Sequence, residues 1–346
     1  MQKNSPEFPQ LLGLRHLWRQ SHPLRFLRRS NRNRSQNSQE KIYRPGPGFP
    51  RRDHGQIHPP LIGQWRLLGP RRKPILGRYA IMHSTSMSSF YNDPQFSYLK
   101  YWQGREYEHQ AEVLAIKRLL GKLRFTQIID IGGGYGRLTS LISQYSKDTT
   151  LVEPSQKQRQ IAKKQLSTLN ISIVSGKASQ TGLSDSSCDL VTMIRLLHHL
   201  PDLSPTFAEA ARILKPHGYF LFEFANSLNF KARLTNLAAG RSLSTLPLER
   251  RRPTNIRRGS IPFVNHHPQA IFKLLTKNGF TTIQTLSVSN FRSSWLKKII
   301  PSPILLVLES IFQYLFSGFY FGPSIFILAR KTSGEQSRTI DILTDL

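Results

Sequence analysis

The segment from Ile128 to Thr139 constrains the fold of this chain more than any other stretch. Ile128, Ile129 and Ile131 surround Asp130, the glycine cluster 132–136 follows, and a helix-like pattern then begins. Glycine lets a backbone adopt positive φ and pass close to a ligand, and the start of a helix leaves N–H groups free. The segment therefore predicts a ligand-binding turn at the carboxyl end of a strand.

Strand-like and helix-like patterns alternate from about residue 88 onward. The patterns predict helices over 107–122, 138–145, 156–169, 204–214, 268–278 and 304–316, and strands over 128–131, 149–152, 171–175, 189–194, 219–224, 280–288 and 324–329. Such alternation is typical of βαβ units. The fold class is therefore predicted to be α/β, a doubly wound and mostly parallel sheet with helices on both faces.

We expect a folded domain over residues 88–331, with insertions at 228–266 and 291–322 and a polar tail at 332–346. Residues 1–87 form a basic leader, because positions 1–82 hold 17 Lys or Arg against three acids. Its Arg- and Pro-rich composition predicts disorder. Three interpretations stay open: translation starting at Met82 or Met87, a basic tail that contacts RNA or anionic lipid, or an organelle transit peptide.

The residues around the turn indicate which cofactor it binds. The dinucleotide pattern G-x-G-x-x-G fails, because Arg137 stands at its third glycine. Asp130 would repel a pyrophosphate but attract an ammonium group such as that of S-adenosylmethionine. Glu153, at the end of the second strand, can accept hydrogen bonds from ribose hydroxyls.

Four segments together resemble a known family. They are Asp130–Gly136, Leu151–Ser155, Cys188–Asp202 and Ala211–Glu223. In order and spacing they resemble class I S-adenosylmethionine-dependent methyltransferases, of the broad group that includes small-molecule and quinone methyltransferases, over roughly residues 100–330. The resemblance implies a Rossmann-like, seven-stranded sheet and an enzyme that moves a methyl group from the cofactor sulfonium to a small-molecule or lipid-like acceptor.

The resemblance also implies roles for individual residues. Asp130, Gly132, Gly133, Gly134 and Gly136 would hold the methionine end of the cofactor, Glu153 the ribose, Ala178 and Ser179 the adenine, and Arg195, with Met193 and Ile194, would flank the methyl group. The acid usual at the adenine is missing, because Lys177 and Ser179 stand there. The candidates for a general base are Glu223, His266 and His198, with His199 and His267 as further possibilities. With one cysteine in the chain, no Cys-rich metal site is expected.

The Arg-rich insertion at 228–266 leaves two interpretations open. Its guanidinium groups can bind an anionic substrate group, or the segment is a solvated loop. The alternative functions are an RNA or protein methyltransferase recruited by basic surface, and an inactive cofactor-binding partner subunit. Arg195-Leu196-Leu197-His198 stands where base-amine methyltransferases carry Asn/Asp-Pro-Pro-Tyr, so nucleic acid is not favoured.

The apolar stretch at 304–329 raises the question of a membrane. A spanning helix needs about 20 apolar residues, and Glu309, Gln313 and Gly322-Pro323 interrupt the run. We therefore expect no spanning helix, but packing on the domain, or an interfacial or lid helix with peripheral membrane contact. The single Cys188 fits a reducing compartment, so a cytoplasmic protein is expected. The oligomeric state stays open.

Overall fold

The computed structural model describes residues 87–258 and 260–332. The expected leader and tail lie outside these ranges, except for Met87 and Thr332. Met87 begins helix α2 (Met87–Asn92), so the boundary expected after residue 87 falls inside a helix.

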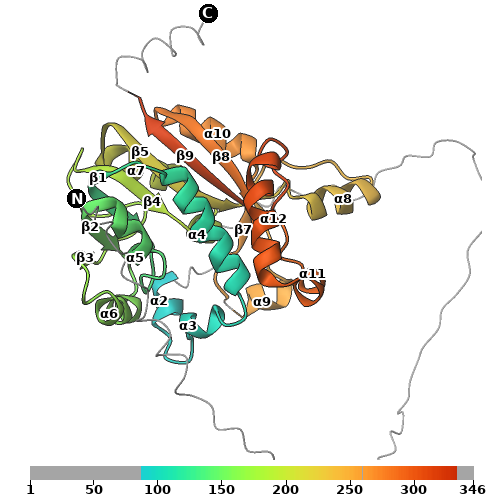
Figure 1. The fold of residues 1–346 in the computed structure, drawn as a ribbon, viewed down its shortest axis with the longest axis horizontal. Coiled ribbons are helices and arrows are strands. Elements are labelled where there is room, and N and C mark those ends of the chain that lie inside the picture. Colours follow the sequence, from blue (N-terminus) through green and yellow to red (C-terminus); the bar gives the residue numbers. More distant parts are fainter. Residues whose placement is uncertain (1–86, 259, 333–346) are drawn as a thin grey trace, which may run out of the picture. The chain divides into compact units, whose positions relative to one another are not determined.

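A seven-stranded sheet forms the centre of the fold, as the sequence predicts (Figure 1). Its order is β3-β2-β1-β4-β5-β9-β8. The strands are β1 (Phe125–Ile131), β2 (Ser146–Val152), β3 (Ile171–Val174), β4 (Cys188–Met193), β5 (Leu214–Ala225), β8 (Phe280–Val288) and β9 (Ser324–Lys331). Neighbours from β3 to β5 pair in parallel, whereas β9 runs antiparallel to both β5 and β8. The chain order reverses between β1 and β4, which is where ligands bind in open α/β sheets.

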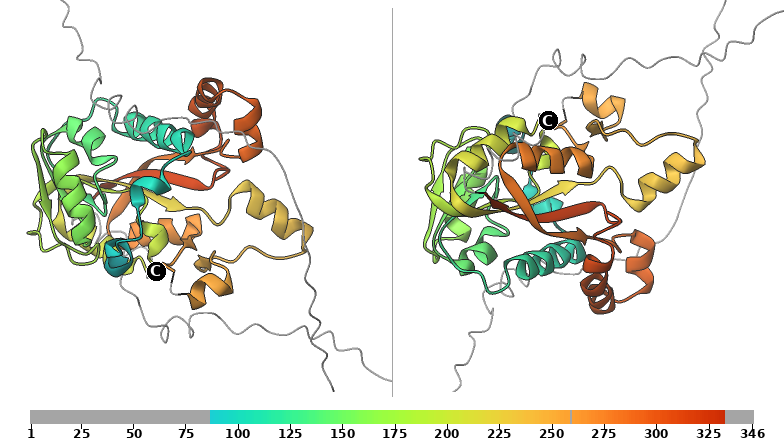
Figure 2. Two further views of the ribbon diagram at one scale, coloured as in Figure 1. Left: turned by 90° about the horizontal axis from the view of Figure 1, so that it is seen from below. Right: turned by 90° about the horizontal axis from the view of Figure 1, so that it is seen from above.

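Helices cover both faces of the sheet (Figure 2). Helix α4 (Glu106–Leu120) and helix α12 (Ser302–Leu315) lie on one face, and α7 (Ser204–Ile213) and α10 (Pro268–Lys277) lie on the other. Helix α5 (Thr139–Ile142) follows the glycine turn, and α6 (Gln156–Gln165) packs near β2 and β3. The apolar residues of α7 and α10 recur at helical spacing; Phe207 packs against Phe220 of β5, and Ile271 and Leu275 are buried in the same core.

Most predicted elements are present, but some boundaries differ. The helix predicted over 138–145 is α5 followed by a 3₁₀ turn (Ser143–Tyr145), and α6 ends at Gln165 instead of residue 169. Strand β5 begins at Leu214 instead of residue 219, because Leu214 pairs with Cys188 before a register shift.

The structure also contains short elements that the patterns do not predict. They are α2, α3 (Tyr98–Tyr101), the 3₁₀ turn Leu197–His199, α8 (Phe230–Ala238), α9 (Pro253–Arg257), α11 (Ser294–Ile299), and the two-stranded ribbon of β6 (Leu248–Glu249) and β7 (Val264–Asn265). Segments this short carry too few residues for a hydrophobic period to be recognised. Among the helices in the described part of the chain, none is long and apolar enough to cross a membrane.

Candidate cofactor and acceptor site

The glycine turn after β1 lets the chain fold closely over Asp130. Gly132 and Gly134 have positive φ values of 71° and 60°. A Cβ atom on Gly133 would lie 2.5 Å from Asp130 Oδ2 and 2.4 Å from Leu151 Cδ1. No other residue fits at position 133 without moving the acid, so the turn and Asp130 form one unit.

Two hydroxyl groups hold the Asp130 carboxylate in place. Thr139 donates to Oδ2 at 2.6 Å, and Thr192 donates to Oδ1 at 2.7 Å. Burial raises the pKa of Asp130, and these two hydrogen bonds oppose that shift. The carboxylate thus has a fixed orientation at the ends of β1 and β4.

Glu153 lies on the other side of the turn, at the end of β2. It accepts hydrogen bonds from the Gly134 N–H at 3.1 Å and from the Ser155 N–H at 2.8 Å. Burial raises the pKa of Glu153 from its ordinary 4.5 to about 7, against the effect of both N–H donors. The acid predicted to bind ribose is therefore in contact with the turn itself.

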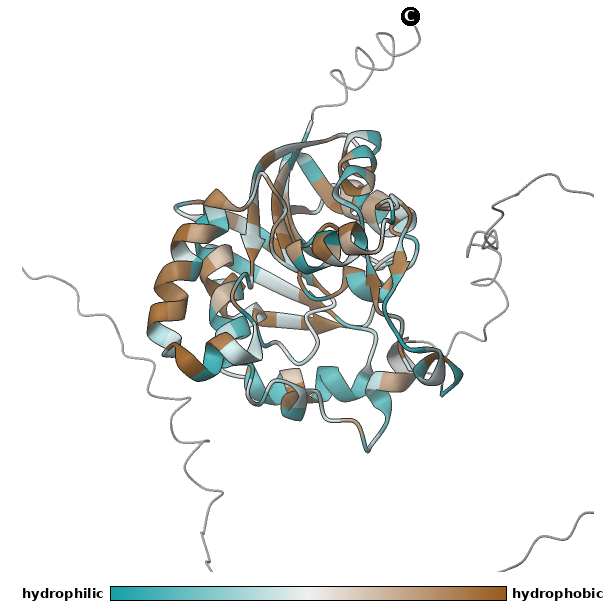
Figure 3. Cartoon of the chain, turned by 90° about the vertical axis from the view of Figure 1, so that its right-hand side faces the viewer, coloured by the Kyte–Doolittle hydropathy of each residue, from teal (hydrophilic) through white to brown (hydrophobic). Residues whose placement is uncertain are grey.

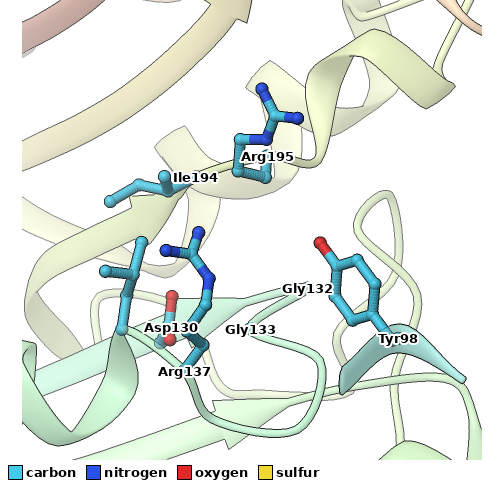
Figure 4. A pocket seen from close by; sticks show the side chains of 8 residues that line it. Tyr98, Asp130, Gly132, Gly133, Arg137, Ile194 and Arg195 are labelled. Carbon is cyan, nitrogen blue, oxygen red and sulfur yellow. The ribbon is translucent and has the colours of Figure 1, made fainter. Parts of the chain in front are cut away.

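A small pocket opens between the turn and the end of β4 (Figure 4). Its lining comprises Tyr98, Asp130, Gly132, Gly133, Arg137, Leu138, Ile194 and Arg195. The structure thus brings together five of the residues predicted at the cofactor, Asp130, Gly132, Gly133, Ile194 and Arg195. Figure 4 shows Arg137 and Tyr98 pointing toward the space beside the turn, whereas the guanidinium of Arg195 points away from the turn.

Glu112 of α4 joins the two arginines of this pocket. Its carboxylate pairs with Arg137 Nη2 at 2.6 Å and with Arg195 Nε at 3.8 Å. The Arg137 guanidinium also stacks on Trp102, 3.5 Å from the ring centroid. Arg195 is in the left-handed region, with φ 62°, which costs a non-glycine residue roughly 1–2 kcal/mol. Such local strain is typical of functional sites.

A second pocket lies on the far side of Arg195. It is lined by Trp102, Arg105, Glu108, Glu112, Arg195, Ser289, Arg292 and Ser324. The Nε atom of Arg195 and the Oε2 atom of Glu108 are buried there and make no hydrogen bond within the described residues. Buried polar groups are nearly always paired in native proteins. A bound molecule with polar groups would satisfy these atoms, so this pocket is the candidate acceptor site.

Glu223, the predicted base on β5, is fully buried beside this second pocket. One oxygen accepts the Arg195 N–H at 3.1 Å, and the other accepts the Ser324 hydroxyl. Burial raises the pKa of Glu223, and the neighbouring Arg195 charge opposes this shift. Both contacts position residues of the pocket, while neither pocket is lined by Glu223 itself.

The candidate histidines are also buried, away from both pockets. His266 contacts the Leu197 carbonyl through Nε2 at 3.1 Å, and His198 packs against Phe263 and His199. Burial lowers the pKa of His198 and of His266. His267 caps α10 by accepting the Gln269 N–H. A catalytic role for these residues stays a prediction.

His199 is tied to the N-terminal helices. Its Nδ1 contacts the Pro262 carbonyl at 2.8 Å, so Nδ1 carries the proton and Nε2 accepts the Tyr91 hydroxyl at 3.0 Å. Burial lowers the pKa of His199 to about 4. The imidazole is therefore neutral at physiological pH, and its tautomer is fixed by the two partners.

The adenine end differs from the methionine end. Ala178 is half-buried against the core, and Ser179 is exposed in a turn closed by the hydrogen bonds between Lys177 and Gln180. Neither residue lines the pocket beside the turn. Gly134 and Gly136, the other two predicted glycines, shape the turn, and Tyr98 packs 3.3 Å from the position of a Cβ on Gly134.

Sequence reasoning missed the aromatic residues before α4. Tyr91, Phe96, Tyr98, Tyr101 and Trp102 contact one another in a chain of ring pairs. The ring of Tyr98 also packs edge-on against the ring of Tyr135 in the turn, with 5.5 Å between the two ring centroids. The density of aromatic residues between 90 and 102 was the available signal, but nothing in it shows that these rings cover the turn. Within the described residues, no group of His, Cys, Asp and Glu could hold a metal ion.

Part of this chain is similar to known methyltransferases. The model of a family described as "Methyltransferase domain" matches residues 129–222. Residues 129–222 of this chain therefore match a methyltransferase domain. The methyltransferase domain is 26% identical over 114 residues to a ubiquinone biosynthesis O-methyltransferase of Alkalilimnicola ehrlichii, covering 32% of this chain and 46% of that protein. It is 27% identical over 118 residues to an uncharacterized methyltransferase of Bacillus subtilis, covering 30% of this chain and 47% of that protein.

Both alignments span about half the length of these curated relatives. Among solved structures, a Thermotoga maritima S-adenosylmethionine-dependent methyltransferase, described as a possible histamine N-methyltransferase, is 20% identical, with a TM-score of 0.45. That match covers 68% of this chain and 94% of the other.

The pocket of the methyltransferase domain fits S-adenosylmethionine. The glycines let the turn pack closely on neighbouring side chains, and carboxylates lie on both of its sides, at Asp130 and Glu153. Asp130 suits an ammonium group and would repel a pyrophosphate, whereas Glu153 suits the diol of a ribose.

Proposed function

We propose that this chain is an S-adenosylmethionine-dependent methyltransferase that acts on a small-molecule or lipid-like acceptor. The observation that carries the proposal is the placement of Asp130 and Glu153 on the two sides of one glycine turn, beside a pocket that reaches Arg195. S-adenosylmethionine supplies an activated methyl group, so the protein mainly has to align the partners and exclude water.

Different residues of the chain would bind the cofactor, exclude water and orient the acceptor. Asp130 and the Gly132–Gly134 backbone hold the methionine end, and Glu153 holds the ribose. Tyr98 covers the turn and excludes water from it. Arg195 lines both pockets, so it lies between the cofactor and the acceptor and is held there by Glu112 and by the Glu223 contact to its N–H.

The acceptor pocket supports a polar or acidic group on the acceptor. Arg105, Arg195 and Arg292 all line it, and the similarity to ubiquinone biosynthesis O-methyltransferases supports a hydroxyl on a lipid-like molecule. Guanidinium groups bind carboxylates and phenolates through paired N–H donors. Arg195 and Arg292 would then orient the acceptor for an in-line displacement.

The test is transfer of a labelled methyl group from S-adenosylmethionine to metabolite and lipid extracts by the full chain. We expect one labelled product class with the wild type and none with Asp130→Asn. The matched control is Asp148→Asn, which changes an exposed acid at the start of β2. Label transfer by D130N at the wild-type rate would remove Asp130 from the site, and the absence of any labelled product together with the absence of cofactor binding would contradict the proposal.

A further inference from the structure

Helix α12 buries polar side chains and exposes apolar ones, the reverse of an ordinary surface helix. Its buried side carries Leu305, Glu309 and Gln313. Its outward side exposes Ile304, Val307, Ile311, Tyr314 and Leu315, with Val307 61% and Ile311 51% exposed. These positions recur at helical spacing, so they form one continuous apolar stripe. Figure 3 shows α12 as a largely hydrophobic helix at the surface.

The polar inner side of α12 is fully used in fixing the helix. The Glu309 carboxylate accepts the Tyr107 hydroxyl at 2.6 Å and the N–H groups of Ser289 and Asn290 at 2.7 and 2.9 Å. Gln313 donates to the Ala111 carbonyl at 2.9 Å. These bonds hold α12 with its apolar stripe outward, so rotation of the helix cannot bury the stripe without leaving a buried carboxylate unpaired.

The stripe belongs to a larger apolar surface. Helix α11 adds Trp295 and Ile299, which are 67% and 58% exposed, and Phe319 follows α12 at 69% exposed. Helix α8 joins this surface, because the Phe230 ring stacks on Phe321 at 4.9 Å and Arg233 Nη2 donates to the Phe319 carbonyl. Phe230, Leu234 and Leu237 of α8 are exposed as well. We call α8, α11, α12 and residues 316–321 the insertion face. Apolar patches of this kind mark interaction sites.

The charge of the segment that carries the insertion face is mainly positive. Residues 228–322 contain 13 Lys and Arg but only two acids, Glu249 and Glu309. Glu309 is buried and Glu249 pairs with Arg251. The exposed bases include Lys231, Arg241, Arg292 and Lys298, which form no ion pair within the described part of the chain. An exposed apolar stripe with aromatic residues and flanking bases is the pattern of helices that lie in an anionic membrane interface.

We propose that the insertion face docks on a bilayer that contains anionic lipid. The apolar stripe of α12, with Trp295 and Phe319, enters the headgroup region, and the bases of α8 and α11 bind the lipid phosphates. Arg292, at the start of this segment, also lines the acceptor pocket. A lipid-like acceptor can therefore pass from the bilayer to the pocket without crossing water, a consequence that rests on the proposed function.

The test places an environment-sensitive fluorophore on the stripe. Cys188 is the single cysteine of the chain and is buried, so a Val307→Cys variant of the full chain can be labelled at one site with NBD. With phosphatidylcholine–phosphatidylglycerol vesicles we expect the NBD emission to rise several-fold and to shift to the blue. With vesicles of pure phosphatidylcholine both changes should be smaller. The matched control is Leu169→Cys, which is exposed beside β3 at the opposite edge of the sheet and should give no change.

A second variant measures the contribution of the stripe to binding. Val307→Glu with Ile311→Glu should weaken partitioning to the anionic vesicles on the order of tenfold or more, because two apolar side chains no longer enter the interface. Both residues are exposed, so the variant should keep the fold and bind cofactor as the wild type does. Leu169→Glu is the matched control and should partition as the wild type does.

Three results would overturn the proposal. NBD at position 307 could stay unchanged although the protein floats with anionic vesicles, which would assign the binding to another part of the chain. The emission could respond equally to neutral vesicles, which would remove the role of the bases. It could rise with protein concentration alone, which would make the insertion face a contact between copies. None of these measurements needs the cofactor, so a failure here is separate from a failure of methyl transfer.

Discussion

The two halves of the site are built in different ways. At the cofactor half, the turn, Asp130 and Glu153 come from 24 consecutive positions, 130–153, and contact one another through β1 and β2. At the acceptor half, Glu112, Arg195, Glu223 and Arg292 come from four distant parts of the chain. A short motif can fix the first arrangement locally, whereas the second requires the whole fold to be assembled.

The largest expected effect is the loss of cofactor binding, from a substitution that alters the cofactor half of the site alone. Gly133→Ala should abolish cofactor binding, because its Cβ would overlap Asp130 Oδ2 and Leu151 Cδ1. Calorimetric titration with S-adenosylmethionine measures the loss. Gly240→Ala is the control: Gly240 has positive φ, unlike Gly133, but nothing lies within 4 Å of its Cβ, so the substitution should cost about 1 kcal/mol in stability and leave binding unchanged. Wild-type affinity in G133A would show that the turn does not hold the cofactor.

The next effect concerns the acceptor half. Glu112→Gln removes the charge that holds both Arg137 and Arg195. We expect kcat/KM for the acceptor to fall about 10- to 100-fold, as for loss of a buried charge pair. Cofactor affinity should fall less, because Asp130 and the glycine turn stay in place although Arg137 and Arg195 also line the cofactor pocket. Glu106→Gln, in the exposed first turn of the same helix, is the control. Equal losses in both measurements would mean that the two halves act as one unit.

The cofactor half was more predictable from sequence than the acceptor half, and the reason is chain separation. Asp130, Gly132 and Gly133 follow a strand pattern and can be placed from it. Nothing local shows that Glu112 of α4 meets Arg195 after β4, or that Tyr98 packs on the turn. The sheet and most helices follow from periodicity, and the short helices α2, α3, α8 and α11 do not.

Glu153 gives the cofactor half a pH dependence. Its pKa is about 7 in the free protein, and only the ionised carboxylate accepts both ribose hydroxyls. Cofactor binding should therefore be strongest above pH 7 and weaken below it, approaching tenfold per pH unit. Titration calorimetry from pH 5.5 to 8.5 measures this slope. Glu153→Gln should bind more weakly and lose the slope, and a slope that persists in this variant would assign it to another group.

The smallest expected effect tests the contact between helix α2 and the rest of the domain. Tyr91→Phe removes the hydroxyl that donates to His199 Nε2 and should lower stability by about 1 kcal/mol. Urea unfolding measures the difference. Tyr314→Phe, an exposed hydroxyl on α12, should be neutral. If Y91F also leaves stability unchanged, the hydrogen bond does not hold α2 on the domain.

The central claim is that the turn between Asp130 and Glu153 is a site for a phosphate-free, ammonium-bearing cofactor. The most direct measurement is calorimetric titration of the full chain with S-adenosylmethionine and, separately, with NAD. The account predicts one-site binding of S-adenosylmethionine and no binding of NAD. Binding of NAD, or no heat with S-adenosylmethionine at about 1 mM, a concentration that would reveal even weak affinity, would contradict it.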